Sequence, residues 1–249
     1  MKLSKESAEK FISILQTASI AGIEKLIIEN KQIRGTSENN SIVVLSKENV
    51  PDFGNLTVGM NRIGVLTSRL NLLKSTGEFT IEAIEAKNKT EVSHLHLKSD
   101  NTSVQYRCAS SEAIQKIPKI INDKLCWLIE IPGKAISLVT MGIAAMASEN
   151  LIFSCKKKGT VDGVYFEAID TDTNDIFSTC FTETLTWIPE ENKEPSNKSF
   201  SHTYPFKILI PLLKTASNNG TEPVNVMIGE KGILTVIVNS YDFFVVPQI

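Results

Sequence analysis

The order of periodic segments repeats once along the chain, and this repeat constrains the fold more than any other feature of the sequence. Apolar side chains recur at helical spacing between Ser4, the predicted N-cap, and Gly22, and again over residues 61–74, and short strand-like runs follow each segment. The same order returns over residues 132–148 and 205–219. The halves share no obvious identity, so the repeat is one of element order. It predicts two tandem, similar α+β domains.

Between the two halves the periodicity breaks. Residues 110–124 follow neither the helical nor the strand period, and Pro118 opposes a continuous helix. We therefore divide the chain into an N-terminal domain of residues 1–110, a connector of residues 111–124 and a C-terminal domain of residues 125–249.

The last quarter of the chain, residues 199–249, shows the pattern of one half most clearly. A short helix that carries Lys207 and Lys214 is followed by two strand-like runs, V-N-V-M-I-G-E-K-G-I-L-T-V-I-V-N-S and Y-D-F-F-V-V-P-Q-I. Pro211 falls inside this helix, and its ring and missing N–H predict a helix that begins nearer Ile208.

Composition narrows the class of protein. A chain of 249 residues with 42% hydrophobic residues can bury a sizeable core, and a net charge of −2 gives no global sign of a nucleic-acid partner. The four cysteines stand far apart without a C-x-x-C pair, the N-terminus is charged, and the most apolar stretch, residues 135–147, is too short to cross a bilayer. We expect an intracellular protein with no membrane partner.

Acidic residues are missing from three of the four predicted helices. The chain has 28 acids, yet none occurs in residues 61–74, 132–148 or 205–219. The same segments carry six bases: Arg62, Arg69, Lys74, Lys134, Lys207 and Lys214. An ordinary solvated helix face mixes both signs, and it remains the alternative for any one helix. Three acid-free helices together favour a surface that faces a polyanion.

The spacing of the bases supports this interpretation. Arg62 and Arg69 are seven residues apart, and so are Lys207 and Lys214. Seven residues make nearly two helical turns, so each pair is predicted to lie along one helix face. A basic face of this kind suits a phosphate backbone, because lysine and arginine release condensed counterions without reading sequence.

Several phrases of the sequence resemble the DNA polymerase sliding clamps, the family that includes proliferating cell nuclear antigen and the T-even phage clamps. The start M-K-L-S-K is similar to that of the phage proteins. The stretch from Y-P-F-K-I-L-I-P-L-L-K to F-F-V-V-P-Q-I resembles the closing helix and hairpins of the cellular clamps, and residues 110–124 lie where the family has its interdomain connector.

This resemblance implies a fold, a partner set and two groups of site residues. The fold is a ring of six similar domains from a homotrimer, with helices inside and antiparallel sheets outside. The partners are double-stranded DNA, bound without sequence preference, and a DNA polymerase and clamp loader, bound through short peptides at the replication machinery. The implied DNA-facing residues are Lys10, Arg62, Arg69, Lys74, Lys134, Lys207 and Lys214. The implied partner-binding residues are Ile117, Pro118, Ile120, Ile121, Val245, Val246, Pro247 and Ile249, each of which has local core as its alternative.

Motifs for catalysis or metal binding are weak. His94 and His96 share a strand face, but an exposed strand pair explains them better than a metal site. The run that starts at Asp170 begins like a calcium loop and lacks its later ligands, so it is interpreted as a hairpin turn. Lys156–Lys158 fit a charged strand end outside any DNA site. We predict no catalytic activity, no metal and no cofactor. The alternative function is a structural or assembly ring whose acid-free helices pack against protein.

Overall fold

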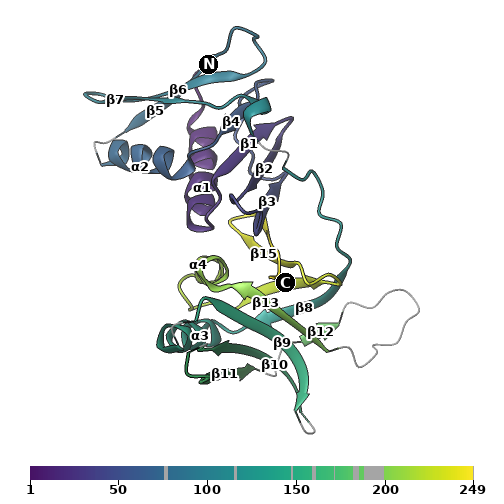
Figure 1. Cartoon of the computed structure of the whole chain (residues 1–249). Coiled ribbons are helices and arrows are strands. Elements are labelled where there is room, and N and C mark those ends of the chain that lie inside the picture. Colours follow the sequence, from purple (N-terminus) through teal and green to yellow (C-terminus); the bar gives the residue numbers. More distant parts are fainter. Residues whose placement is uncertain are drawn as a thin grey trace. The chain divides into compact units, whose positions relative to one another are not determined.

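The computed structural model describes residues 1–75, 78–114, 117–146, 148–158, 161–170, 172–181, 185–187 and 199–248 (Figure 1). Two compact units make up the chain. Unit 1 comprises Met1–Ile120 with Asn239–Asp242, and unit 2 comprises Ile121–Val238 with Phe243–Ile249. The short return segment belongs to unit 1 because the Asn239 amide donates to the Thr17 hydroxyl oxygen at 3.1 Å.

Unit 1 has two helices and two antiparallel sheets. Helix α1 (Lys5–Ile20) packs against α2 (Ile63–Lys74), and α1 and α2 also contact β5 and β6 respectively. One sheet has the order β4-β1-β2-β3 and the other the order β5-β6-β7. The strands are β1 (Lys25–Glu29), β2 (Gln32–Thr36), β3 (Ile42–Ser46), β4 (Val58–Met60), β5 (Phe79–Glu85), β6 (Val92–Ser99) and β7 (Ser103–Arg107).

Unit 2 is built in the same way. Helix α3 (Gly133–Met146) packs on β10, β11 and α4 (Phe206–Ala216), and α4 packs on β13 and β15. One sheet has the order β11-β10-β9-β13, and the other contains β12, β8, β14 and β15 in that order. The strands are β8 (Leu125–Ile131), β9 (Asn150–Lys158), β10 (Val161–Ile169), β11 (Ile176–Phe181), β12 (Leu185–Trp187), β13 (Phe200–Pro205), β14 (Val224–Gly229), β15 (Leu234–Val238) and β16 (Tyr241–Val245), the last of which begins in the segment assigned to unit 1.

The strand orders show that the repeat is one of topology as well as element order. In each unit a helix leads into a three-strand meander, and a fourth strand returns to pair with the first strand of that meander. A second helix then leads into further antiparallel strands that lie beside the strand that opens the unit. In unit 2 this opening strand is β8, which pairs with β14; in unit 1 it is the N-terminal segment, where the Leu3 amide donates to the Ile81 carbonyl of β5 at 2.9 Å.

Each unit has its own core between helices and sheets. Phe11 of α1 meets Phe53 edge-on in unit 1 with ring centroids 5.4 Å apart, and Phe153 stacks on Phe166 in unit 2 at 4.5 Å. Gly142 lets α3 approach its sheet closely, because a Cβ at this position would lie 2.4 Å from the Phe177 ring of β11. This close approach explains a glycine in a helix interior, where it lowers helix stability.

Most predicted elements agree with the structure, and the helix starts are the main corrections. Ser4 is the N-cap of α1, as expected, and its hydroxyl accepts from the Ser7 amide at 3.2 Å. Helix α2 begins at Ile63 with Arg62, not Asn61, at the N-cap position. Helix α3 begins after Pro132, whose carbonyl accepts from the Ala135 amide at 2.9 Å. The expected late start of the fourth helix is wrong, since α4 begins at Phe206 and contains Pro211.

Two strands were missed by the sequence patterns. Strand β12 pairs with β8, and β13 pairs with β9 along its whole length. The sequence of β13, F-S-H-T-Y-P, contains three residues that favour strands, Phe200, Thr203 and Tyr204, but it lies directly before the helix in sequence, and its pairing with β9 fixes its conformation. Across the described ranges, no helix combines the length and the apolar character needed to span a membrane.

Candidate nucleic-acid interface and partner site

The two arginines of the α2 segment both lie against β7. The Arg62 guanidinium carbon is 5.8 Å from the centroid of the buried Tyr106 ring, and Arg69 Nη1 donates to the Gln105 carbonyl at 2.9 Å. Adjacent residues of one strand therefore hold both guanidiniums. This arrangement orders the two side chains and uses part of their hydrogen-bonding capacity within unit 1.

Two of the predicted DNA-facing lysines form ion pairs. Lys10 Nζ lies 2.6 Å from Glu6 Oε1 one turn earlier in α1, and this pair lowers the pKa of Glu6 below its ordinary value. Lys207 Nζ lies 3.0 Å from Glu149 Oε1, with both side chains well exposed. Glu6 and Glu149 lie outside the acid-free segments, so the sequence pattern did not reveal these partners. Exposed pairs of this kind are weak and can exchange for a phosphate.

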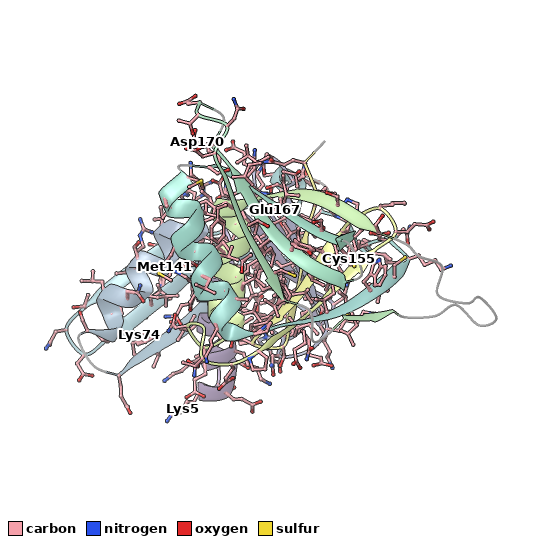
Figure 2. The ribbon with its side chains drawn as sticks, turned by 90° about the horizontal axis from the view of Figure 1, so that it is seen from below. Lys5, Lys74, Met141, Cys155, Glu167 and Asp170 are labelled. Atoms are coloured by element: carbon pink, nitrogen blue, oxygen red, sulfur yellow. The ribbon has the colours of Figure 1, made fainter. Side chains whose placement is uncertain are left out.

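The other three lysines have no ion pair among the described residues. Lys74 ends α2 and is exposed, as Figure 2 shows, and Lys134 lies exposed at the start of α3. Lys214 lies half-buried in the last turn of α4, where its charge also complements the helix dipole. These three lysines are the strongest candidates for direct phosphate contact.

The exposed faces of α2 and α3 also carry apolar side chains. Val65 and Leu72 of α2 are 42% and 55% exposed, and Leu138 and Met141 of α3 are 49% and 62% exposed. Figure 2 labels Met141 on α3. The sequence analysis did not identify this apolar character. It could have been found from α3, whose sequence G-K-A-I-S-L-V-T-M-G-I-A-A-M continues apolar residues beyond one stripe.

The first part of the connector is fastened to β2 by a buried arginine. Arg34 Nη1 donates to the Ile117 carbonyl at 3.1 Å, and its other terminal nitrogen pairs with the Glu29 carboxylate of β1. The Arg34 side chain is only 8% exposed, and burial lowers the pKa of its guanidinium. A buried charge of this kind requires such partners, because an unpaired one is costly to desolvate.

The last part of the connector is fastened to the β14–β15 turn within unit 2. The Asp123 carboxylate accepts from the amides of Lys231 at 2.9 Å and Ile233 at 3.0 Å, and Lys231 Nζ donates to the Asn122 carbonyl at 3.0 Å. Between the two fastened ends, Pro118 and Ile120 are exposed, and Ile120 is the most exposed large apolar residue of the described chain at 72%.

The predicted partner-binding residues differ in their exposure. Ile117 and Val245 are 5% and 0% exposed, so their side chains belong to the cores of units 1 and 2, in agreement with the alternative given for them. Ile121, Val246 and Pro247 are half-buried in unit 2. Ile249 lies outside the described residues. The accessible apolar groups in this set are therefore those of the middle connector and of the C-terminal tail.

The histidine pair lies on a strand, and the run that resembles a calcium loop lies in a turn. His94 and His96 lie on β6 with ring centroids 6.2 Å apart. The Asp170 side chain accepts from the amides of Asp172 and Thr173 in the turn between β10 and β11, which confirms the hairpin. The side chains of Lys156–Lys158 lie outside the described part. In that part, no three histidine, cysteine or acidic side chains cluster as metal ligands would.

Three strand edges are left open in the described parts of the sheets, and one of them belongs to β12, which is three residues long and pairs only with β8. The outer edges of β4, β5 and β13 are covered by short bridges to Ala109, Lys2 and Gln248 respectively. β7 pairs only with β6, and β11 pairs only with β10. An open edge presents unpaired backbone groups that favour pairing with another chain.

The comparisons with known proteins bear on the fold. No protein-family model and no curated protein sequence matches the chain. Among solved structures, the chain is similar to the one described as "C-terminal region of FEN-1 bound to A. fulgidus PCNA", where PCNA is proliferating cell nuclear antigen. The TM-score is 0.59 and the identity 15%, over 96% of this chain and 96% of that chain. The chain therefore has the DNA-clamp fold, with two tandem α+β domains of helices and antiparallel sheets.

Proposed function

We propose that this protein is a sliding clamp, a ring of three chains that encircles duplex DNA and tethers DNA polymerase and other replication proteins. The observation that carries the proposal is the clamp fold of the full chain, combined with the absence of any acidic residue from helices α2, α3 and α4. The proposed role is binding and topological linkage, so it assigns no catalytic residues to the chain.

The DNA contacts are proposed to come from lysines of the four helices. Lys74, Lys134 and Lys214 have no ion pair among the described residues, and Lys10 and Lys207 can exchange exposed carboxylates for phosphates. Contacts of this kind position a protein on the duplex without reading its sequence. A small number of contacts also suits sliding, because a topologically linked ring does not need tight phosphate binding to stay on DNA.

Ring closure is proposed to use the open edges of β7 and β11. They belong to different units, so pairing β7 of one chain with β11 of the next is a head-to-tail contact that closes a ring when the rotation allows it. Strand β11 presents Ile176, which is 65% exposed, at this edge. Burial of this side chain in the joint would stabilise the ring.

The connector and the C-terminal tail are proposed as the docking site for partner peptides. In the similar solved structure, PCNA is bound to the C-terminal region of FEN-1. In this chain the exposed Pro118 and Ile120 provide an apolar surface on a connector that is fastened at both ends, which lowers the entropy lost when a peptide binds.

The DNA contacts can be tested with the double variant Lys74→Glu, Lys134→Glu. Each phosphate contact contributes about 0.9 to the slope of log K against log salt, so loss of both contacts is expected to reduce the slope by about 2 for each chain of the ring that contacts the duplex. Binding to a duplex is measured by fluorescence anisotropy across a salt series.

The matched control is Lys87→Glu, Lys89→Glu, which makes the same charge change in the β5–β6 turn. An equal reduction in both variants would contradict the assigned DNA face, and native mass spectrometry checks that both keep three chains of 27.5 kDa.

A second candidate function is a structural ring whose helices pack against protein. The exposed Val65, Leu72, Leu138 and Met141 favour it, because such side chains gain little from a phosphate backbone. In this case the Lys74→Glu, Lys134→Glu variant still packs against its protein partner, whereas apolar-to-polar changes at Leu138 and Met141 abolish that packing.

A further inference from the structure

A cavity in unit 1 shares only Lys10 with the proposed DNA and connector surfaces. Its volume is about 350 Å³, and it forms where α1, the β1–β2 turn and the segment after β3 meet. Its floor is apolar and includes Ile28, Pro51 and Phe53. Phe53 is 2% exposed and packs edge-on against Phe11, so the floor is fixed by the core of the unit. Lys10 is the one predicted site residue in its lining.

The acidic groups of the cavity are already engaged. The Glu29 carboxylate pairs with Arg34, and Asp52 Oδ1 accepts from the Gly54 amide at 2.8 Å. Lys10 is paired with Glu6. By contrast, Lys31 and Lys47 line the cavity without an ion pair among the described residues. Asp52 has no ion pair among the described residues either, so two lysines face one carboxylate and the net unpaired charge at this site is positive.

The backbone holds the polar rim in a defined conformation. Glu29 pairs with Gln32 in the β1–β2 hairpin, so Asn30 and Lys31 form a two-residue turn, and their φ angles of 49° and 55° are both left-handed. Such a turn matches the twist of the flanking strands and is rigid. Because the turn fixes the backbone that carries Lys31, less conformational entropy is lost when a ligand binds there.

We propose that this cavity binds an acidic peptide segment of a partner protein. An apolar side chain of the peptide occupies the floor, and carboxylates on either side pair with Lys31 and Lys47. A nucleic-acid strand fits less well, since its phosphodiesters cannot donate a hydrogen bond to the Asp52 carboxylate, which has no ion pair among the described residues, whereas the backbone N–H groups of a peptide can. The site depends on residues of unit 1 alone, so it does not require the proposed clamp function.

The test uses the full chain and a fluorescein-labelled nonapeptide in which one leucine is flanked by four glutamates on each side. Fluorescence anisotropy at low salt is expected to show saturable binding below about 1 mM, as a small, partly electrostatic interface allows. Lys31→Glu, Lys47→Glu is expected to weaken binding at least about tenfold, because two attractive pairs become repulsive. Replacing the leucine of the peptide by glycine is expected to weaken binding several-fold.

The control variant is Lys87→Glu, Lys89→Glu, which carries the same charge change in the same unit but outside the cavity. Circular dichroism confirms that both variants fold. The proposal is overturned by the absence of binding up to about 1 mM, by equal weakening in the two variants, or by a glycine peptide that binds as well as the leucine peptide. Binding of a labelled thymidine oligonucleotide that only Lys31→Glu, Lys47→Glu abolishes, with the peptide unaffected, overturns it in favour of a nucleic-acid site.

Discussion

At the scale of single residues, the contacts that hold the connector join positions far apart in the chain. Arg34 and Ile117 are 83 residues apart, and Asp123 and Ile233 are 110 apart. The sequence contains each of these residues but no local pattern that pairs them. The positive charges themselves could be predicted, and so could the ion pair of Lys10 with Glu6, because the two lie four residues apart on a predicted helix. The pair of Lys207 with Glu149 joins positions 58 residues apart and could not be assigned without coordinates.

His202 provides a test of the connector's surroundings through pH. Burial lowers the pKa of its imidazole below the ordinary value of 6.5, although the Asp123 carboxylate opposes this effect. The unfolded chain then binds the proton more readily than the folded chain, so protonation destabilises the fold. The contribution of His202 to the free energy of unfolding is expected to be fully present above pH 6.5. It is expected to fall as the pH drops from there toward the lowered folded-state pKa.

Thermal unfolding of the wild type and of His202→Gln between pH 7.5 and 5.0 measures this effect. We expect the melting temperature of the wild type to decrease more over this range than that of the variant, with a difference of a few degrees or less. Parallel curves for the two proteins would contradict the assignment of a destabilising proton to His202.

At the scale of elements, strands and helices were predicted where local composition and tertiary contacts favour the same conformation. The β-branched runs of β1 and β3 are examples. Prediction failed where tertiary contacts decide the conformation. Helix α4 keeps Pro211 because four buried residues, Leu209, Ile210, Leu212 and Leu213, surround it in sequence and their burial outweighs one lost hydrogen bond. Strand β13 was missed because it depends on pairing with β9.

The fastening of the connector can be tested with Arg34→Lys. A lysine keeps the charge next to Glu29 but lacks the planar fork that reaches two acceptors, so the hydrogen bond to the Ile117 carbonyl is expected to be lost. A loss of about 1–2 kcal/mol corresponds to roughly tenfold faster amide exchange at residues 119–121. Hydrogen exchange measured by mass spectrometry gives the local effect, and thermal unfolding gives the global one.

The control for this variant is Lys98→Ala, which removes the exposed pair with Glu82 at 3.2 Å. Exposed pairs contribute little, so neither the connector nor the melting temperature is expected to change. If Arg34→Lys lowers the melting temperature but leaves exchange at residues 119–121 unchanged, Arg34 stabilises unit 1 without fixing the connector.

At the scale of the whole molecule, the repeated topology supports the proposed ring, to which each chain would contribute two similar segments. Each unit has two helices, a returning four-strand sheet and an independent core. The open edges of β7 and β11 lie in different units, as head-to-tail assembly requires. The fold was predicted from element order, because order and topology persist at 15% identity, where individual side chains do not.

The central claim is that the protein holds DNA by encircling it. Labelled protein is incubated with nicked circular DNA, together with its clamp loader or under conditions that open the ring, and the DNA is then separated by gel filtration at high salt. The account predicts that the protein stays with the circle, because phosphate contacts are screened and only topology retains it. Cutting the circle with a restriction enzyme should release the protein. Equal retention on circular and linear DNA, or release from both at high salt, would contradict the account.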